Sequence, residues 1–161
     1  MSFFKSIHKE IVNSMGDFEG HLKGFMCNIK HNELKKYLKN YTDLPLQIAL
    51  MSETESILLI EELYVDEYAR GCGHGSEMIE RAMNESFSHN IETTMLICDT
   101  DETQVVGFDL KRFYEKHGFY QINKHRSTEY PIMIAPMHVA KDIEEALLNI
   151  EQICQPKQQR A

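Results

Sequence analysis

One stretch of the chain, between residues 57 and 87, limits the fold more than any other part of the sequence. It begins with a long apolar run, Ile57 to Val65, which predicts a strand covered on both faces. A glycine-rich loop, Arg70 to Gly75, follows, and the apolar spacing then predicts a helix to about Phe87. Glycines in such a loop let backbone N–H groups converge beside the positive end of the helix dipole. The stretch therefore predicts either a pyrophosphate site or a tight strand-to-helix turn that needs glycine only for its positive φ.

The spacing of the glycines excludes two common phosphate-binding loops. A nucleotide P-loop needs Lys and then Ser or Thr after its last glycine, whereas Gly75 is followed by Ser76 and Glu77. The dinucleotide fingerprint needs GxGxxG, whereas Gly71, Gly73 and Gly75 give GxGxG. A phosphate ligand of this loop is therefore expected to be of another kind.

The part of the chain before this stretch predicts mainly helices. A helical stripe covers Met1–Met15 and Gly16 ends it, a weak strand covers Gly24–Lys30, and a short helix covers Asn32–Asn40. The apolar run Leu46–Met51 then predicts a strand that forms a β-hairpin with Ile57–Val65.

The part after this stretch predicts alternating strands and helices. In order, we expect a strand over Thr93–Cys98, an acidic connector over Asp99–Gly107, a helix over Asp109–His117, strands from Phe119 and over Ile132–Ala135, and an amphipathic helix over Val139–Ile153. Together these elements predict one α/β domain over residues 1–154. It consists of a helical N-terminal part (1–44), a core (45–136) and a C-terminal helix (138–154), and a flexible tail (155–161) follows it.

Composition and charge exclude several classes of protein. The 25 acidic and 17 basic residues give a net charge of -8, which suits cationic partners such as amines better than nucleic acid, or serves solubility alone. The 4 cysteines are scattered without metal-ligand spacing, so we expect no metal site and free thiols in a reducing compartment. No apolar run approaches the roughly 20 residues that span a membrane. The protein is expected in the cytoplasm, away from membranes.

Two motifs together give the chain a family resemblance. Arg70, Gly73 and Gly75 match the Arg/Gln-x-x-Gly-x-Gly/Ala loop that binds acetyl-CoA in GNAT N-acetyltransferases, and Phe113–Phe119 (FYEKHGF) is similar to the helix-to-strand signature that follows it there. The resemblance covers roughly Leu46 to Pro136, and the chain looks like the short members found in phages and mobile elements. It implies an α+β fold with a mixed, mostly antiparallel central sheet that splays at the cofactor site. Helices flank this sheet, and the C-terminal helix is an addition.

The resemblance also implies how acetyl-CoA is held. Leu63, Tyr64 and Val65 would pair their backbone with the pantetheine arm, besides any role of these residues in core packing. The pyrophosphate would lie on the loop formed by Arg70, Gly71, Cys72, Gly73, His74, Gly75 and Ser76. Arg70 would contact a phosphate, or is a surface residue at the start of the loop.

The same resemblance assigns the catalytic residues. Tyr114 would be the general acid that protonates the leaving thiolate, whereas its helical spacing alone fits a core aromatic equally well. Glu62, ranked slightly above Glu61, would be the general base, unless both carboxylates lie at a solvated strand end. Because adjacent strand residues point to opposite faces, at most one of the two is expected to face the acceptor.

The expected reaction is direct transfer of an acetyl group from acetyl-CoA to a primary amine in a ternary complex. The amine is a small molecule, a protein lysine or a protein N-terminus, and the acidic residues Asp99, Asp101 and Glu102 would attract it. Two alternatives stay open. One is a catalytically silent interaction module whose C-terminal helix offers a surface for a partner or for homodimer formation. The other is a toxin that acetylates aminoacyl-tRNA, against which the net charge of -8 argues.

Overall fold

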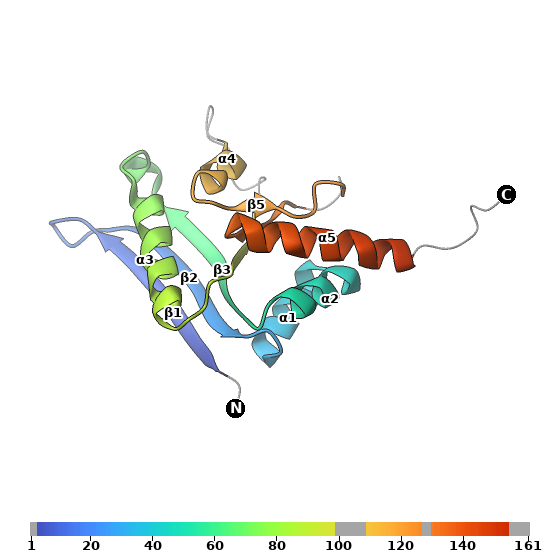
Figure 1. Ribbon diagram of the computed structural model, residues 1–161. Helices are drawn as coiled ribbons and strands as arrows, with labels where there is room; N and C mark the ends of the chain where they lie inside the picture. The colour runs from blue at the N-terminus through green and yellow to red at the C-terminus, as the bar shows by residue number, and fades with distance from the viewer. Residues whose placement is uncertain (1–2, 99–108, 127–129, 155–161) are drawn as a thin grey trace.

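A single sheet with helices on both faces organises the protein (Figure 1). The computed structural model describes residues 3–98, 109–126 and 130–154. Its elements, in chain order, are β1 (Phe4–Val12), β2 (Phe18–Asn28), α1 (Asn32–Tyr41), α2 (Leu44–Glu53), β3 (Ser56–Val65), the 3₁₀ turn η1 (Glu67–Ala69), α3 (His74–Ser88), β4 (Thr94–Ile97), α4 (Leu110–Glu115), β5 (Tyr120–Gln121), β6 (Ile132–Ala135) and α5 (Met137–Cys154).

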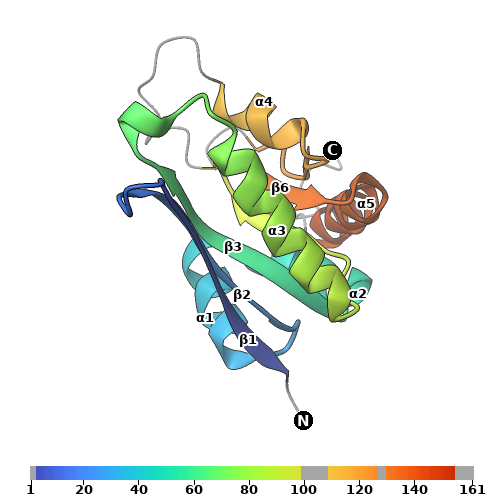
Figure 2. The same cartoon turned by 90° about the vertical axis from the view of Figure 1, so that its left-hand side faces the viewer.

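The sheet is mixed and mostly antiparallel, as predicted. Its 6 strands run in the order β1-β2-β3-β4-β6-β5, and only the β3–β4 pair is parallel. One core cluster lies between the sheet and α1, α2 and α5, and a second lies between the sheet and α3 and α4. Figure 2 shows α3 across the near face of β2 and β3, with α1 and α2 on the far side.

The first predicted helix is wrong, because Phe4–Val12 forms the edge strand β1. Ile7 and Ile11, which suggested a helical stripe, are four residues apart, and that spacing also keeps two residues on one face of a strand. Both are buried on the α3 side of the sheet, where Lys9 Nζ lies 2.7 Å from the Glu85 carboxylate of α3. Gly16 ends no helix but has a φ of +84° in the turn between β1 and β2.

The predicted hairpin is also wrong, because the run after Pro45 is the helix α2. Asp43 caps it, since its Oδ1 accepts a hydrogen bond from the Leu46 amide at 3.1 Å. Proline in the first turn suits a helix start, where its missing N–H is not needed. Leu46, Ala49 and Leu50 are fully buried at helical spacing, so α2 covers the same sheet face as α5.

Most of the other predicted elements are confirmed with small changes at their ends. These are α1, β3, α3, β4, α4, β6 and α5, and the weak strand predicted over Gly24–Lys30 is the C-terminal part of the longer β2. The N-terminal region is therefore a two-stranded hairpin followed by a helix, rather than a mainly helical segment. The acidic connector and the tail after Cys154 lie outside the described residues.

Strand β3 has a β-bulge at the point where its pairing with β4 ends. Lys23 of β2 pairs with Glu62 and Gly24 pairs with Ile60, so Glu61 is an extra residue without a partner on β2. On the other edge of β3, β4 pairs only with Leu58–Ile60. The last half of β3 therefore has no strand beside it on the β4 side within the described residues.

Gly24 makes this arrangement possible, and its replacement tests it. A Cβ atom at Gly24 would lie 2.1 Å from the Leu59 carbonyl oxygen, which is backbone and cannot turn aside. We expect Gly24→Ala to lower the free energy of unfolding by about 3 kcal/mol or more. Gly16→Ala is the matched control, because its φ of +84° costs about 1–2 kcal/mol, while no atom from the described part of the chain lies within 4 Å of the added Cβ. Urea unfolding followed by circular dichroism measures both, and equal losses would contradict this account of the bulge.

Candidate active site

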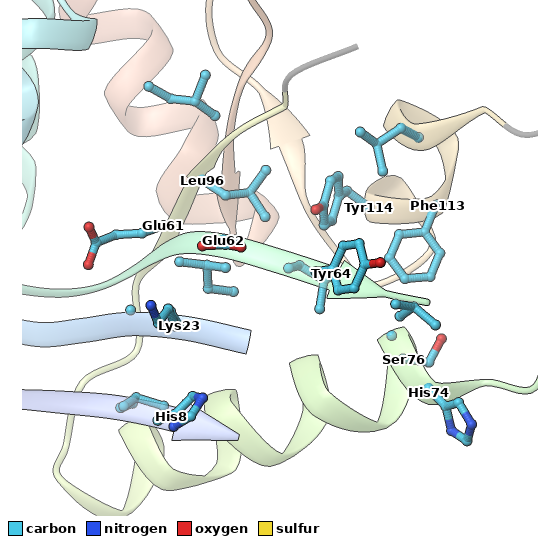
Figure 3. Close-up of a pocket in the computed structure, with 18 of the residues that line it drawn as sticks. His8, Lys23, Glu61, Glu62, Tyr64, His74, Ser76, Leu96, Phe113 and Tyr114 are labelled. Carbon is cyan, nitrogen blue, oxygen red and sulfur yellow. The ribbon is translucent and has the colours of Figure 1, made fainter. Parts of the chain in front are cut away.

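A cleft of about 1610 Å³ opens where β3 leaves β4. Residues from β1, β2 and β3 line it together with α1, the glycine loop, the start of α3 and α4 (Figure 3). Every predicted cofactor-binding residue except Cys72 lines this cleft, as do the three predicted catalytic residues, Tyr114, Glu61 and Glu62. Cys72 is exposed and lies outside the lining.

The glycine loop presents backbone amides to the cleft. Gly71 and Gly73 have φ values of +86° and +82°, which L side chains rarely adopt, and no atom of the described residues lies within 4 Å of a Cβ added at either position. Gly73 caps α3 without a side chain, and the first intrahelical bond runs from the Glu77 amide to the Gly73 carbonyl. The amides of residues 74–76 thus precede the hydrogen-bonded part of the helix and are available to an anion.

Two side-chain pairs fix this loop from either side. His74 Nε2 lies 2.6 Å from Glu19 Oε2 at the start of β2, and both side chains are largely buried. On the other side, Ser76 Oγ and His117 Nε2 are 2.9 Å apart, which joins the loop to the end of α4. The sequence offered no signal for either pair, because the partners lie far apart in the chain.

Gly75 serves close packing rather than an unusual φ. A Cβ atom at this position would lie 3.1 Å from Cζ of Phe113. The absence of a side chain therefore lets the ring of Phe113, on α4, lie against the first turn of α3. The two predicted motifs meet at this contact.

The residues at the end of β3 differ in burial between the two faces of the strand. Leu63 and Val65 are partly buried and pack against the α3-side core, whereas Tyr64 on the opposite face is 40% exposed. Arg70 folds back toward the strand, where its Nε donates a hydrogen bond to the Val65 carbonyl at 3.1 Å. Arg70 thus joins the loop to β3, and it also lines the cleft.

Tyr114 fits both predicted descriptions, since it is a core aromatic and also lines the cleft. It is only 7% exposed, and its ring makes edge contacts with Phe113 and Phe119, at centroid distances of 5.3 and 5.8 Å. Figure 3 shows its oxygen directed toward β3, across the cleft from Tyr64 and Glu62. The packing holds the phenol in one place while its polar end faces the cavity.

The bulge changes the expected orientation of the two carboxylates. Ile60 and Leu63 both pack on the α3 side, so the two residues between them break the alternation of the strand. Glu61 and Glu62 both lie on the other face and line the same cleft. The expected alternation of Glu61 and Glu62 is therefore wrong, because it assumed an unbroken strand; which of them faces the acceptor stays a prediction.

Glu62 has a partner that the sequence did not reveal. His21 of β2 lies with its Nε2 2.8 Å from Glu62 Oε1, and the rings of Phe18 and Tyr64 lie beside the imidazole. His21 is 20% exposed and Glu62 is 52% exposed, so the pair stands at the cleft surface. Only the pairing of β2 with β3 brings the two side chains together.

Comparison with known proteins identifies the family. A family model described as "Acetyltransferase (GNAT) domain" matches residues 42–121, which hold the glycine loop, Tyr114 and both carboxylates. The chain belongs to the GNAT acetyltransferase family. A search of the curated proteins found no match.

Solved structures of other proteins share the fold at low sequence identity. An acetyltransferase from Bacillus cereus ATCC 14579 is 17% identical with a TM-score of 0.51, over 81% of this chain and 72% of that one. Naa20 from Chaetomium thermophilum, in complex with a bisubstrate analogue, is 14% identical with a TM-score of 0.52, over 83% and 67%. Arylalkylamine N-acetyltransferase 2 from Aedes aegypti is 14% identical with a TM-score of 0.50, over 79% and 71%.

The described residues of the GNAT chain were also searched for membrane-spanning helices and for groups of metal-binding side chains. None of their helices has the length and apolar character needed to cross a membrane. In the same ranges, no three His, Cys, Asp or Glu side chains gather so as to hold a metal ion.

The cysteines differ in their expected reactivity. Burial raises the pKa of the Cys27 thiol to about 11, so this thiol is almost entirely protonated at pH 8, and its thiolate forms only at strongly alkaline pH. Cys72 is exposed. We expect iodoacetamide at pH 8 to modify Cys72 and leave Cys27 intact, as measured by mass spectrometry of peptides. Both should react in urea, and equal rates in the folded protein would contradict the burial of Cys27.

Proposed function

We propose that the protein is an N-acetyltransferase that moves an acetyl group from acetyl-CoA to a primary amine by direct transfer. The observation that supports this most is the position of the glycine loop. Its free amides, the open edge of β3 and the phenol of Tyr114 all face one cleft. This combination serves a ligand that has a diphosphate, a long flexible arm and a reactive end.

The residues present fit acetyl-CoA. The amides of residues 74–76 and the helix dipole of α3 suit the diphosphate, and the lack of side chains at Gly71 and Gly73 leaves space for it. The half of β3 that β4 leaves unpaired offers backbone groups to the pantetheine arm, although the Val65 carbonyl already accepts from Arg70. When bound, acetyl-CoA supplies an acetyl group activated as a thioester.

Tyr114 is the proposed general acid. Its hydroxyl faces the cleft from α4, and its ring is held by Phe113 and Phe119. A phenol in that place can donate its proton to a thiolate that leaves, which avoids the release of a poor, charged leaving group. Because packing already fixes the phenol of Tyr114, no conformational entropy has to be lost to position this proton donor when the proton is transferred.

Glu62 is the proposed general base, and His21 is its positioning partner. The hydrogen bond from the imidazole occupies Oε1 of Glu62, which leaves Oε2 to take a proton from the attacking amine, directly or through water. Figure 3 shows Glu62 on the same side of the cleft as Tyr64, whereas the carboxylate of Glu61 points away from Tyr114. This arrangement favours Glu62 over Glu61 for the proton transfer.

The acceptor is proposed to be a positively charged amine. The net charge of -8 and the two carboxylates in the cleft both favour cations. The names of two proteins with a similar fold point to acetylation of arylalkylamines and to a bisubstrate complex, but at 14% identity each they share only the fold. The acceptor class therefore has to come from the side chains of this chain.

Calorimetric titration with acetyl-CoA tests the donor site. We expect saturable binding by the wild type and its loss in Gly73→Glu, which adds bulk and negative charge where the diphosphate would lie. Gly16→Glu is the matched control, because Gly16 also has a positive φ but lies in the turn between β1 and β2. If the folded wild type does not bind acetyl-CoA, the proposed transferase activity is contradicted, and the remaining interpretation is a catalytically silent interaction module with a GNAT fold.

Two substitutions test the proton transfers. We expect Tyr114→Phe and Glu62→Gln each to lower kcat by about 10²–10⁴-fold, because each removes a group that moves a proton. The binding of acetyl-CoA should persist in both variants. The controls are Tyr120→Phe, whose hydroxyl bonds to Glu144 at 2.9 Å, and Glu53→Gln at the end of α2; neither residue lines the cleft. A kcat for Tyr114→Phe equal to that of Tyr120→Phe would contradict the assignment of the acid.

A further inference from the structure

A second, smaller cavity opens beside the cleft, on its α1 side. It has a volume of about 370 Å³ and lies between α1 and the face of β1 and β2 that is turned away from α3. The two cavities share five lining residues, so a ligand in the cleft can extend into this side pocket without crossing a wall. The shared residues are Ser6, Gly24, Tyr37, Tyr41 and Glu61.

Glu61 gives the side pocket a negative charge. As the extra residue of the bulge it lies on the α1 face of the sheet, and no ion pair to it is found among the described residues. Glu33 and Lys36 also line the pocket, but the ammonium of Lys36 lies 3.4 Å from the Glu33 carboxylate, so these two charges balance one another. Lys23 lines the cleft and not the side pocket. The carboxylate of Glu61 is therefore the charge in this pocket that a ligand can neutralise.

Aromatic rings complete the walls. Tyr37 and Tyr41 of α1 lie with their ring centroids 4.6 Å apart, and Tyr41 is 58% exposed toward solvent and the pocket. Phe4 of β1 packs against Phe25 on the floor of the pocket, at a centroid distance of 5.2 Å. Burial raises the pKa of Tyr37, and Tyr41 and the charge of Glu61 raise it further, so this phenol stays neutral. Neutral aromatic faces beside one carboxylate attract organic cations.

We propose that the side pocket binds a second cationic group of the acceptor, and that the acceptor is a short diamine. This inference rests on the proposed function of the cleft. The Cα atoms of Glu61 and Glu62 are about 3.8 Å apart, and the bulge puts both side chains on one face. One amine can therefore be deprotonated at Glu62 while the other, linked through a short alkyl chain, lies between Glu61 and the tyrosines.

The chemistry of this acceptor balances with a single transfer. An amide bond forms between the acetyl carbon and the nitrogen at Glu62, and the carbon–sulfur bond of the thioester breaks. Of the two protons that the reacting ammonium loses, one ends on the sulfur and one in solvent. The second ammonium group is unchanged, and it determines which amine is acetylated.

Calorimetric titration with putrescine and with n-butylamine tests the side pocket in the full chain. The two compounds have carbon chains of equal length and differ by one amine. We expect the wild type to bind putrescine about tenfold more tightly, equivalent to about 1.4 kcal/mol. In Glu61→Gln and in Tyr41→Leu this ratio should fall toward one. Glu53→Gln, which makes the same change of charge outside both cavities, should keep the ratio of the wild type.

The outcomes separate this site from the proposed enzyme activity. Equal affinities of the wild type for the two amines, or a ratio that Glu61→Gln leaves unchanged, would overturn the side pocket as a cation site. Thiol release from acetyl-CoA is measured separately with each amine. Acetylation of n-butylamine as efficient as that of putrescine would also count against the subsite. If the preference in binding is kept but no thiol is released from acetyl-CoA with either amine, the side pocket stands and the transferase proposal fails.

Discussion

The close approach of β2 to β3 at Gly24 is the constraint on which the site depends. Because no side chain separates Gly24 from the Leu59 carbonyl, β3 can carry one residue more than the strand it pairs with. The extra residue turns both carboxylates to one face and returns Leu63 to the α3-side core. The bulge lies where β4 ends its pairing, so both carboxylates stand beside the open edge of β3.

The parts of the fold that sequence could predict are those with a distinctive local pattern. The glycine loop and the start of α3 were predictable because alternate glycines at the end of an apolar run have few other uses. The edge strand β1 was not, because the spacing of Ile7 and Ile11 satisfies both a helix and a strand. The helix α2 was missed although its signal was present, in Asp43 followed two residues later by a proline.

The site itself was predictable only in outline. Tyr114 and the loop follow motifs that are continuous in the chain, and the structure brings them into one cleft. The sequence of β3 contains nothing that predicts the bulge. The residue that permits it is Gly24, which lies in the neighbouring strand β2. His21 could not be found because its partner Glu62 is 41 residues away and only the strand register joins them. The family match begins at residue 42, so β1, β2 and α1, which supply His21, Tyr37 and Tyr41, lie outside it.

Strand β2 touches the two halves of the site at points two residues apart. Glu19 contacts His74 in the glycine loop, and His21 contacts Glu62. A displacement of this strand therefore acts on the glycine loop and on the carboxylate of Glu62 together, which are the proposed donor and acceptor sides of the site. In thermodynamic terms, any coupling transmitted through β2 is reciprocal, so a donor that tightens the binding of the amine is itself held more tightly by the same factor when the amine is present.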